Sequence, residues 1–215
     1  LTFSASFSDP GVLDTHTALW NWGDGTTSVG AISEINGSGT ASDTHSYLTA
    51  GIYTIRLTVT DKDSGISNEV SFMLVIYDPN GGFVTGGGWI DSPAGAYLPD
   101  PTLSGKATFG FVAKYKKGSS VPDGNTQFVF HAGKLNFHSQ SYEWLVVNRG
   151  GNNAQFKGRG MINGEEGYLF MIWTGDGSPD TFRIKLWRED SSGEFVVYDN
   201  GADQALSGGS IIIHK

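Results

Sequence analysis

Aspartates in turns are the side chains of this sequence whose type and spacing most clearly suggest chemistry. Asp61 and Asp63 are two residues apart in the turn 61–65, and Asp9 lies in another loop. Carboxylate and backbone carbonyl oxygens are the ligands that Ca²⁺ prefers. We therefore expect calcium at Asp9, Asp61 and Asp63 first, and at a second acidic turn with Asp176 and Asp180 next. The alternative is a set of ordinary solvated turns, because the spacing is not that of an EF-hand loop.

Aromatic residues that alternate with apolar ones are the candidates for binding sugars, because a sugar ring stacks on an indole while polar neighbours bond its hydroxyls. In the segment 182–187 the apolar side chains share one face, which leaves Arg183, Lys185 and Trp187 on the other. The alternative for Trp187 is capped or merely semi-exposed packing, since single exposed apolar residues are normal. The other candidates of this kind are Trp89, which follows three glycines, and Tyr97.

The remaining tryptophans are predicted to lie in the core. Trp144 and Trp173 stand in runs that are apolar on both faces, so both read as core residues. Trp20 and Trp22 share one face of a strand, and one of them is expected to be the central aromatic of its core.

Catalytic motifs are missing from the sequence. It has no cysteine, no nucleophile elbow, no metalloprotease helix motif and no phosphate-binding loop. Glu165 and Glu166 are adjacent and are better explained as part of a turn than as a glycosidase pair. His131 and His138 lack a third nearby ligand, so they are predicted to be surface histidines rather than a metal site. We expect a protein that is not an enzyme.

The elements that must position these residues are strands. Helical periodicity is hard to find, whereas short alternating or apolar runs recur about every ten residues between clusters of Gly, Asn, Asp and Ser, and 31 of the 215 residues are glycine. In 53–60, residues 53, 55, 57 and 59 form an apolar face. A hairpin is predicted around 131–134, with Phe130 opposite Leu135 and Phe128 opposite Phe137. The fold class is all-β.

Charge divides the chain into two parts and excludes some partners. The net charge of −8 argues against a nucleic-acid binder, and no apolar run approaches the roughly 20 residues of a membrane span. Residues 1–78 carry nine acidic and two basic side chains, whereas 79–215 carry thirteen and twelve. Pro79 and two glycines place a linker at 79–82, between a domain at 1–78 and a second at 83–215. The start of the sequence reads as the middle of a strand, so we expect a fragment of a longer protein.

Three segments of the first domain form a specific pattern: Trp20-Asn21-Trp22-Gly23-Asp24-Gly25, His45-Ser46-Tyr47 and the strand 51–61. With these segments the domain resembles the PKD family of small immunoglobulin-like β-sandwiches. The resemblance implies a location outside the cell and a packed, structural role for His45. Two departures are the absence of the family's first strand before Leu1 and a longer Gly/Ser-rich insertion at 31–44.

The second domain resembles C-terminal modules that follow PKD-type repeats in large secreted bacterial proteins. The segments that carry this resemblance are 83–90, 105–111, 141–147 and 208–213. Eight apolar runs between 107 and 214 predict a second β-sandwich, similar to a jelly roll.

The resulting prediction is a non-catalytic accessory region of a secreted bacterial enzyme or surface protein. It would space and anchor its parent on polysaccharide or another extracellular polymer, with the other domains of the parent as further partners. The competing prediction is a calcium-stiffened stalk or adhesin segment that makes protein–protein contacts. Neither involves nucleic acid or insertion into a membrane.

Overall fold

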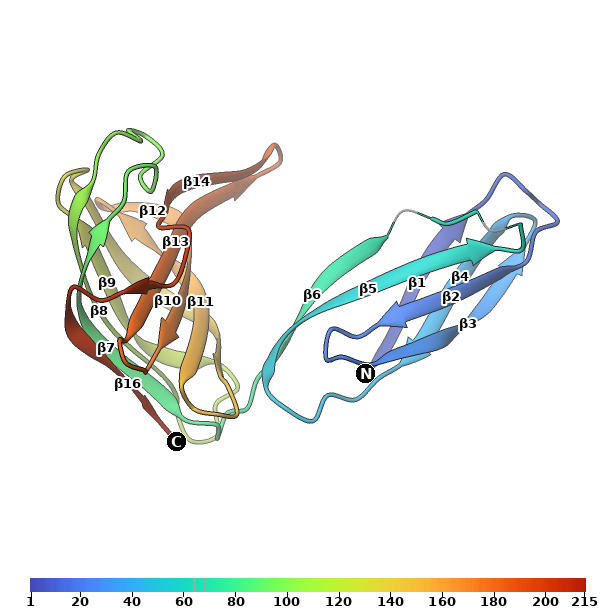
Figure 1. Ribbon diagram of the computed structural model, residues 1–215, viewed down its shortest axis with the longest axis horizontal. Helices are drawn as coiled ribbons and strands as arrows, with labels where there is room; N and C mark the ends of the chain where they lie inside the picture. The colour runs from blue at the N-terminus through green and yellow to red at the C-terminus, as the bar shows by residue number, and fades with distance from the viewer. Residues whose placement is uncertain (64, 68) are drawn as a thin grey trace. The chain divides into compact units, whose positions relative to one another are not determined.

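The computed structural model describes residues 1–63, 65–67 and 69–215, and its chain divides into two units, Leu1–Ile76 and Tyr77–Lys215 (Figure 1). The described residues form sixteen strands and no helix. The all-β, two-domain prediction is confirmed. The last strand of the first unit ends at Ile76 and the next strand begins at Phe83.

The first unit is one antiparallel set of six strands, in the order β1-β4-β3-β2-β5-β6. Its strands are β1 (Thr2–Ser8), β2 (His16–Asn21), β3 (Thr27–Ile35), β4 (Ser38–Thr44), β5 (Gly51–Asp61) and β6 (Val70–Ile76). The predicted apolar face of β5 is observed, with Ile55, Leu57 and Val59 buried. The Gly/Ser-rich insertion turns out to be regular, because β3 and β4 form a hairpin whose turn has positive φ at Asn36 and Gly37.

Stacked aromatic rings fill the core of the first unit. Trp20 and Trp22 are both fully buried, and their rings stack with centroids 5.3 Å apart. His45 stacks on Trp22 at 4.7 Å and its Nε2 lies 2.8 Å from Oδ2 of Asp24. His45 is thus a packed, hydrogen-bonded residue, and two tryptophans rather than one form the centre of the core.

The second unit is a ten-stranded sheet in the order β14-β13-β12-β11-β10-β9-β8-β7-β16, with β15 paired to β13. Its strands are β7 (Phe83–Ser92), β8 (Gly105–Tyr115), β9 (Pro122–Phe130), β10 (Leu135–Val147), β11 (Asn153–Ile162), β12 (Glu165–Gly175), β13 (Thr181–Asp190), β14 (Gly193–Asp199), β15 (Gln204–Ala205) and β16 (Gly208–His214). From β7 to β14 each strand pairs with its successor, which is a meander. The jelly-roll detail of our prediction is therefore wrong, since a jelly roll requires crossover connections between two sheets.

The sheet of the second unit curls so that its inner face packs against itself (Figure 1). Phe109 of β8 stacks on Phe182 of β13, with ring centroids 3.9 Å apart. Phe128 of β9 packs against Tyr198 of β14, with ring centroids 4.8 Å apart. These contacts join strands that are distant in the sheet order, so the two halves face each other as in a sandwich.

Two tryptophans predicted for this core lie outside it. Trp144 and Trp173 are only partly buried, whereas Tyr142, Leu145 and Ile172 belong to the core. Register shifts in β10, on both sides of residues 141–142, break its alternation and turn Trp144 outward. Trp173 follows the regular alternation of β12, whose outer face is also apolar, and no periodicity distinguishes two apolar faces.

Candidate functional site

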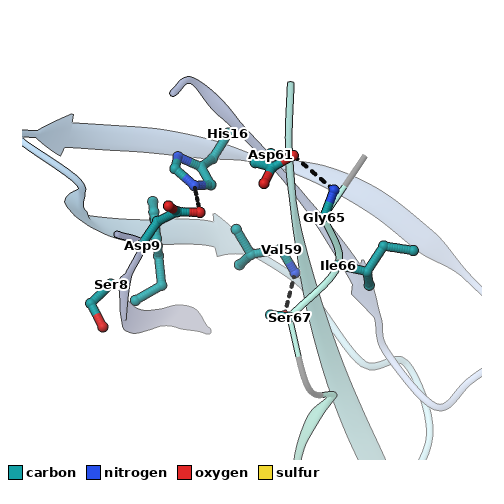
Figure 2. A pocket seen from close by; sticks show the side chains of 9 residues that line it. Ser8, Asp9, His16, Val59, Asp61, Gly65, Ile66 and Ser67 are labelled. Atoms are coloured by element: carbon teal, nitrogen blue, oxygen red, sulfur yellow. Dashed lines mark hydrogen bonds and ion pairs between the residues drawn. The ribbon is translucent and has the colours of Figure 1, made fainter. Parts of the chain in front are cut away.

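Three aspartates of the first unit converge at one end of its sheet. The carboxylate groups of Asp9, Asp14 and Asp61 each offer an oxygen within 4.8 Å of the other two. Asp9 follows β1, and Asp61 ends β5, where it pairs with His16 at the start of β2. Figure 2 shows Asp9, His16 and Asp61 lining one opening of about 200 Å³. The structure thus brings together two of the predicted calcium ligands, and adds Asp14.

Protein donors already occupy much of this carboxylate cluster. Oδ1 of Asp61 accepts the backbone amides of Asp63 and Gly65, both at 2.8 Å. The ammonium of Lys62 lies 2.8 Å from Oδ1 of Asp14 and 2.6 Å from Oδ2 of Asp63. The side chain of Asp63, the third predicted ligand, therefore pairs with Lys62 instead of joining the cluster.

His16 is, with Asp14, a residue of this site that the sequence analysis missed. Its Nδ1 lies 2.6 Å from Oε2 of Glu34 and its Nε2 lies 3.3 Å from Oδ2 of Asp9, while only 3% of the side chain is exposed. Burial opposes a charge on the ring, but the hydrogen bonds to the two carboxylates outweigh it and raise the pKa of His16. The position of His16 two residues before Ala18 and four before Trp20, on the inward face of β2, is the signal that predicts its burial.

The second predicted calcium pair has a structural role in the second unit. Oδ2 of Asp180 accepts the backbone amide of Ile211, and Oδ2 of Asp176 accepts that of Ile213, both at 2.8 Å. These amides belong to β16, the edge strand, and point away from its partner β7. The two carboxylates are therefore hydrogen-bond acceptors for an otherwise open sheet edge, and they are not in the cluster of potential metal ligands found in the described residues.

The predicted sugar platform at Trp187 is covered by its neighbours. The side chain is 5% exposed, its Nε1 donates to Oε1 of Glu189 at 2.8 Å, and the ammonium groups of Lys157 and Lys185 lie 5.7 and 5.1 Å from its ring centroid. The expectation of an exposed indole is wrong, because the long cationic side chains of Lys185 on the same strand and Lys157 on β11 lie over the ring.

The two basic residues predicted to bind sugar near Trp187 are also paired with carboxylates. Arg183 makes two hydrogen bonds to Asp199, both at 3.1 Å, and its guanidinium lies 4.5 Å from the ring centroid of Trp173. Lys185 pairs with Glu194 at 2.6 Å. This outer face is consequently a set of internally paired charges over tryptophan rings.

Trp89 and Tyr97 differ in their surroundings. Trp89 is partly exposed on the outer face of β7, with the ammonium of Lys106 at 4.8 Å from its ring centroid. Tyr97 packs against the core, with its ring 5.8 Å from that of Phe130. Of the predicted sugar-binding aromatics, Trp89 is the one that the structure leaves available.

The first unit combines a tryptophan strand, a turn with positive φ at Gly23 and Gly25, and a histidine stacked on the second tryptophan. Residues 1–76 match the family model of the PKD domain. No curated protein and no solved structure matched the chain.

The PKD unit indicates the general kind of protein. PKD domains occur in extracellular or surface proteins and suggest a structural or adhesion-type module. PKD domains and all-β sandwiches are typically non-catalytic. Within the described part of the chain, no helix is long and apolar enough to span a membrane.

Glu165 and Glu166, the one carboxylate pair considered for glycoside hydrolysis, have separate partners. Oε2 of Glu165 accepts from Arg188 at 2.9 Å, and Oε1 of Glu166 accepts from Gln140 at 2.8 Å. Because the two side chains engage different neighbours, this pair provides no shared site for a sugar.

Proposed function

We propose that the chain is a non-catalytic accessory region of a secreted bacterial enzyme or surface protein, and that it spaces and anchors its parent on an extracellular polysaccharide. The PKD unit supports the spacing role, because this family suggests a structural or adhesion-type module. The observation that carries the anchoring role is Trp89, a partly exposed indole on the outer face of the second unit that pairs with the hydroxyl-bearing Thr108 and has the ammonium of Lys106 over its ring. A partly exposed aromatic with polar groups beside it suits a sugar ring.

Affinity electrophoresis of the whole chain against soluble polysaccharides, together with pull-down on insoluble ones, tests this function. Retardation by at least one polymer is the expected result. Trp187→Ala tests the other sugar-binding site predicted from the sequence, which comprises Trp187, Arg183 and Lys185. Because Trp187 is covered, we expect this variant to retain binding. Failure of the wild type to bind any polymer contradicts the anchoring role.

A second candidate function, a calcium-stiffened stalk or adhesin segment, is favoured by the convergence of Asp9, Asp14 and Asp61. Three carboxylates attract a divalent cation, and Ca²⁺ would take the place of Lys62 beside Asp14. A native-state ligand at one hundred times its dissociation constant stabilises by about 2.7 kcal/mol.

Thermal unfolding of the whole chain in Ca²⁺ and in chelator measures this effect. The midpoint of the PKD unit is expected to rise with Ca²⁺ in the wild type and to respond less in Asp61→Asn. Asp190→Asn, at the exposed end of β13 in the second unit, is the matched control. A wild-type midpoint that is the same in Ca²⁺ and in chelator contradicts the calcium proposal and leaves the anchoring proposal standing.

A further inference from the structure

Two glycines on the outer face of the second unit are not required by the fold. Gly87 of β7 and Gly110 of β8 are directly paired, and neither is among the residues with positive φ. A Cβ at Gly110 would meet nothing within 4 Å, and one at Gly87 would meet only a backbone oxygen at 3.8 Å. By contrast, a Cβ at the neighbouring Gly86 would lie 2.4 Å from the ring of Phe111. Glycine weakens a strand interior, and it marks a place where something approaches the backbone closely.

One of the paired glycines, Gly110, lines a shallow hollow, and Gly87 lies directly beside it on β7. The hollow has a volume of about 230 Å³ and is lined by Thr108, Gly110, Gln127 and Val129 of the neighbouring strands β8 and β9. Gly110 lies between Gly87 and Gln127 in one row across the sheet. The hollow therefore adjoins a place where two paired residues lack side chains on an otherwise regular sheet surface.

The rim of the hollow is aromatic and polar, with the charged side chain of Lys106 over Trp89. In the row on one side, Trp89 pairs with Thr108, which pairs with Val129. In the row on the other side, Val112 pairs with Asn125. Gln127 and Asn125 are exposed, so their amides are accessible for hydrogen bonds.

This rim differs from the outer face around Trp187. There the tryptophans lie under Lys157, Lys185 and Arg183, and all three cations pair with carboxylates. At the hollow, a single cation, Lys106, lies over Trp89, and the lining residues carry neither sign of charge. An acidic polymer would find little positive charge here, whereas a neutral sugar chain would find an indole, a methyl surface, hydroxyl and amide groups.

We propose that this hollow binds a neutral polysaccharide chain, with a sugar ring seated over Gly87 and Gly110, its C–H edge against Trp89, and its hydroxyls on Gln127 and Thr108. This inference rests on the proposed anchoring function and assigns its site and ligand class. Shallow aromatic sites with a few convergent polar groups recognise ligands in this way.

Filling the hollow tests the proposal without removing any contact from the core. Gly110→Ala and Gly110→Val add one and three carbon atoms to an open position with ordinary strand φ, so both variants are expected to fold with an unchanged or higher thermal midpoint. Trp89→Ala removes the stacking surface, and Trp173→Ala is its matched control on the other outer face.

The probes are hydroxyethyl cellulose, xylan and galactomannan as neutral polymers, with polygalacturonate as the acidic one, in affinity electrophoresis of the whole chain. We expect the wild type to bind a neutral polymer, Gly110→Val and Trp89→Ala to bind at least tenfold more weakly, Gly110→Ala to be intermediate, and Trp173→Ala to be unchanged. If the wild type binds a neutral polymer and Gly110→Val binds equally well, the hollow is the wrong site while the anchoring function stands. Binding of polygalacturonate alone overturns the ligand class, and no binding to any probe overturns the anchoring function together with its site.

Discussion

Replacing Asp180 with alanine should loosen the C-terminal edge of the second unit. Its Oδ2 accepts the amide of Ile211 at 2.8 Å, and its Oδ1 accepts that of Gly177 at 2.9 Å. Ile211 is 1% exposed and belongs to β16, whose only paired strand among the described residues is β7. The variant leaves this strand with one amide unpaired on its free side.

The free energy lost in Asp180→Ala follows from the charge of the carboxylate acceptor. A hydrogen bond to a charged group contributes about 1.5–3 kcal/mol, and the amide of Gly177 adds little because water replaces its partner in an exposed turn. This corresponds to a 10- to 150-fold change, as an order of magnitude, in the equilibrium for opening of the edge strand. If opening is coupled to unfolding of the unit, the midpoint falls by about 6–12 °C. Asp180→Asn keeps an oxygen acceptor without the charge, and should lose about half as much free energy.

Hydrogen exchange measured at the amide of Ile211, with calorimetry of the whole chain, provides the assay. Protection at Ile211 should fall in Asp180→Ala and less in Asp180→Asn. Asp190→Ala is the control, since Asp190 accepts only the amide of Ser192 in an exposed turn among its contacts in the described structure. Unchanged exchange at Ile211 in Asp180→Ala would refute the view that this carboxylate closes the sheet edge.

Three further outcomes are expected. The carboxylate neighbours of His16 raise its pKa above the ordinary value of 6.5, so the stability that they provide is complete below pH 6.5 and is lost as the pH rises through the raised pKa. Thermal midpoints of the PKD unit measured from pH 5 to 9 should therefore fall for the wild type and vary less for His16→Gln. Parallel curves of midpoint against pH for the two proteins contradict this prediction. The hydrogen bond from Thr26, with a smaller contribution from His45, lowers the pKa of Asp24 to about 2, so the PKD unit should lose stability as the pH falls from about 4 to 2. In acid unfolding followed by circular dichroism, Asp24→Asn should lose less stability over this pH range than the wild type. Phe182→Ala should cost the second unit about 3–5 kcal/mol in urea unfolding, because the ring is fully buried against Phe109, and a cost below about 1 kcal/mol would contradict its central place in the core.

Local patterns were sufficient to predict the hairpin of the second unit. Phe130 pairs with Leu135 and Phe128 with Phe137, as predicted. The alternation of apolar residues fixes the face, and a short turn fixes the register, so no distant contact is needed. The same reasoning failed for β11, whose glycines and polar residues hide a strand that is paired on both sides.

Spacing in the sequence was not sufficient to predict which side chains form the calcium and sugar sites. Asp61 and Asp63 are near neighbours in sequence, yet only Asp61 joins Asp9 and Asp14, because Lys62 holds the side chain of Asp63. Whether a side chain has free atoms depends on its partners from other strands, and sequence separation does not reveal them.

By itself, the sequence determined the all-β class, the division into two units and the PKD motifs, since these follow from periodicity, turn residues and short-range patterns. Tertiary structure alone decided which exposed-face residues remain available. Trp187 alternates as an outward residue but is covered by lysines of two strands, whereas Gly87 and Gly110 come from different strands and lie side by side at the hollow only because the sheet pairs them. Alternation along one strand determines the direction of a side chain, and only the register between strands determines what lies beside it.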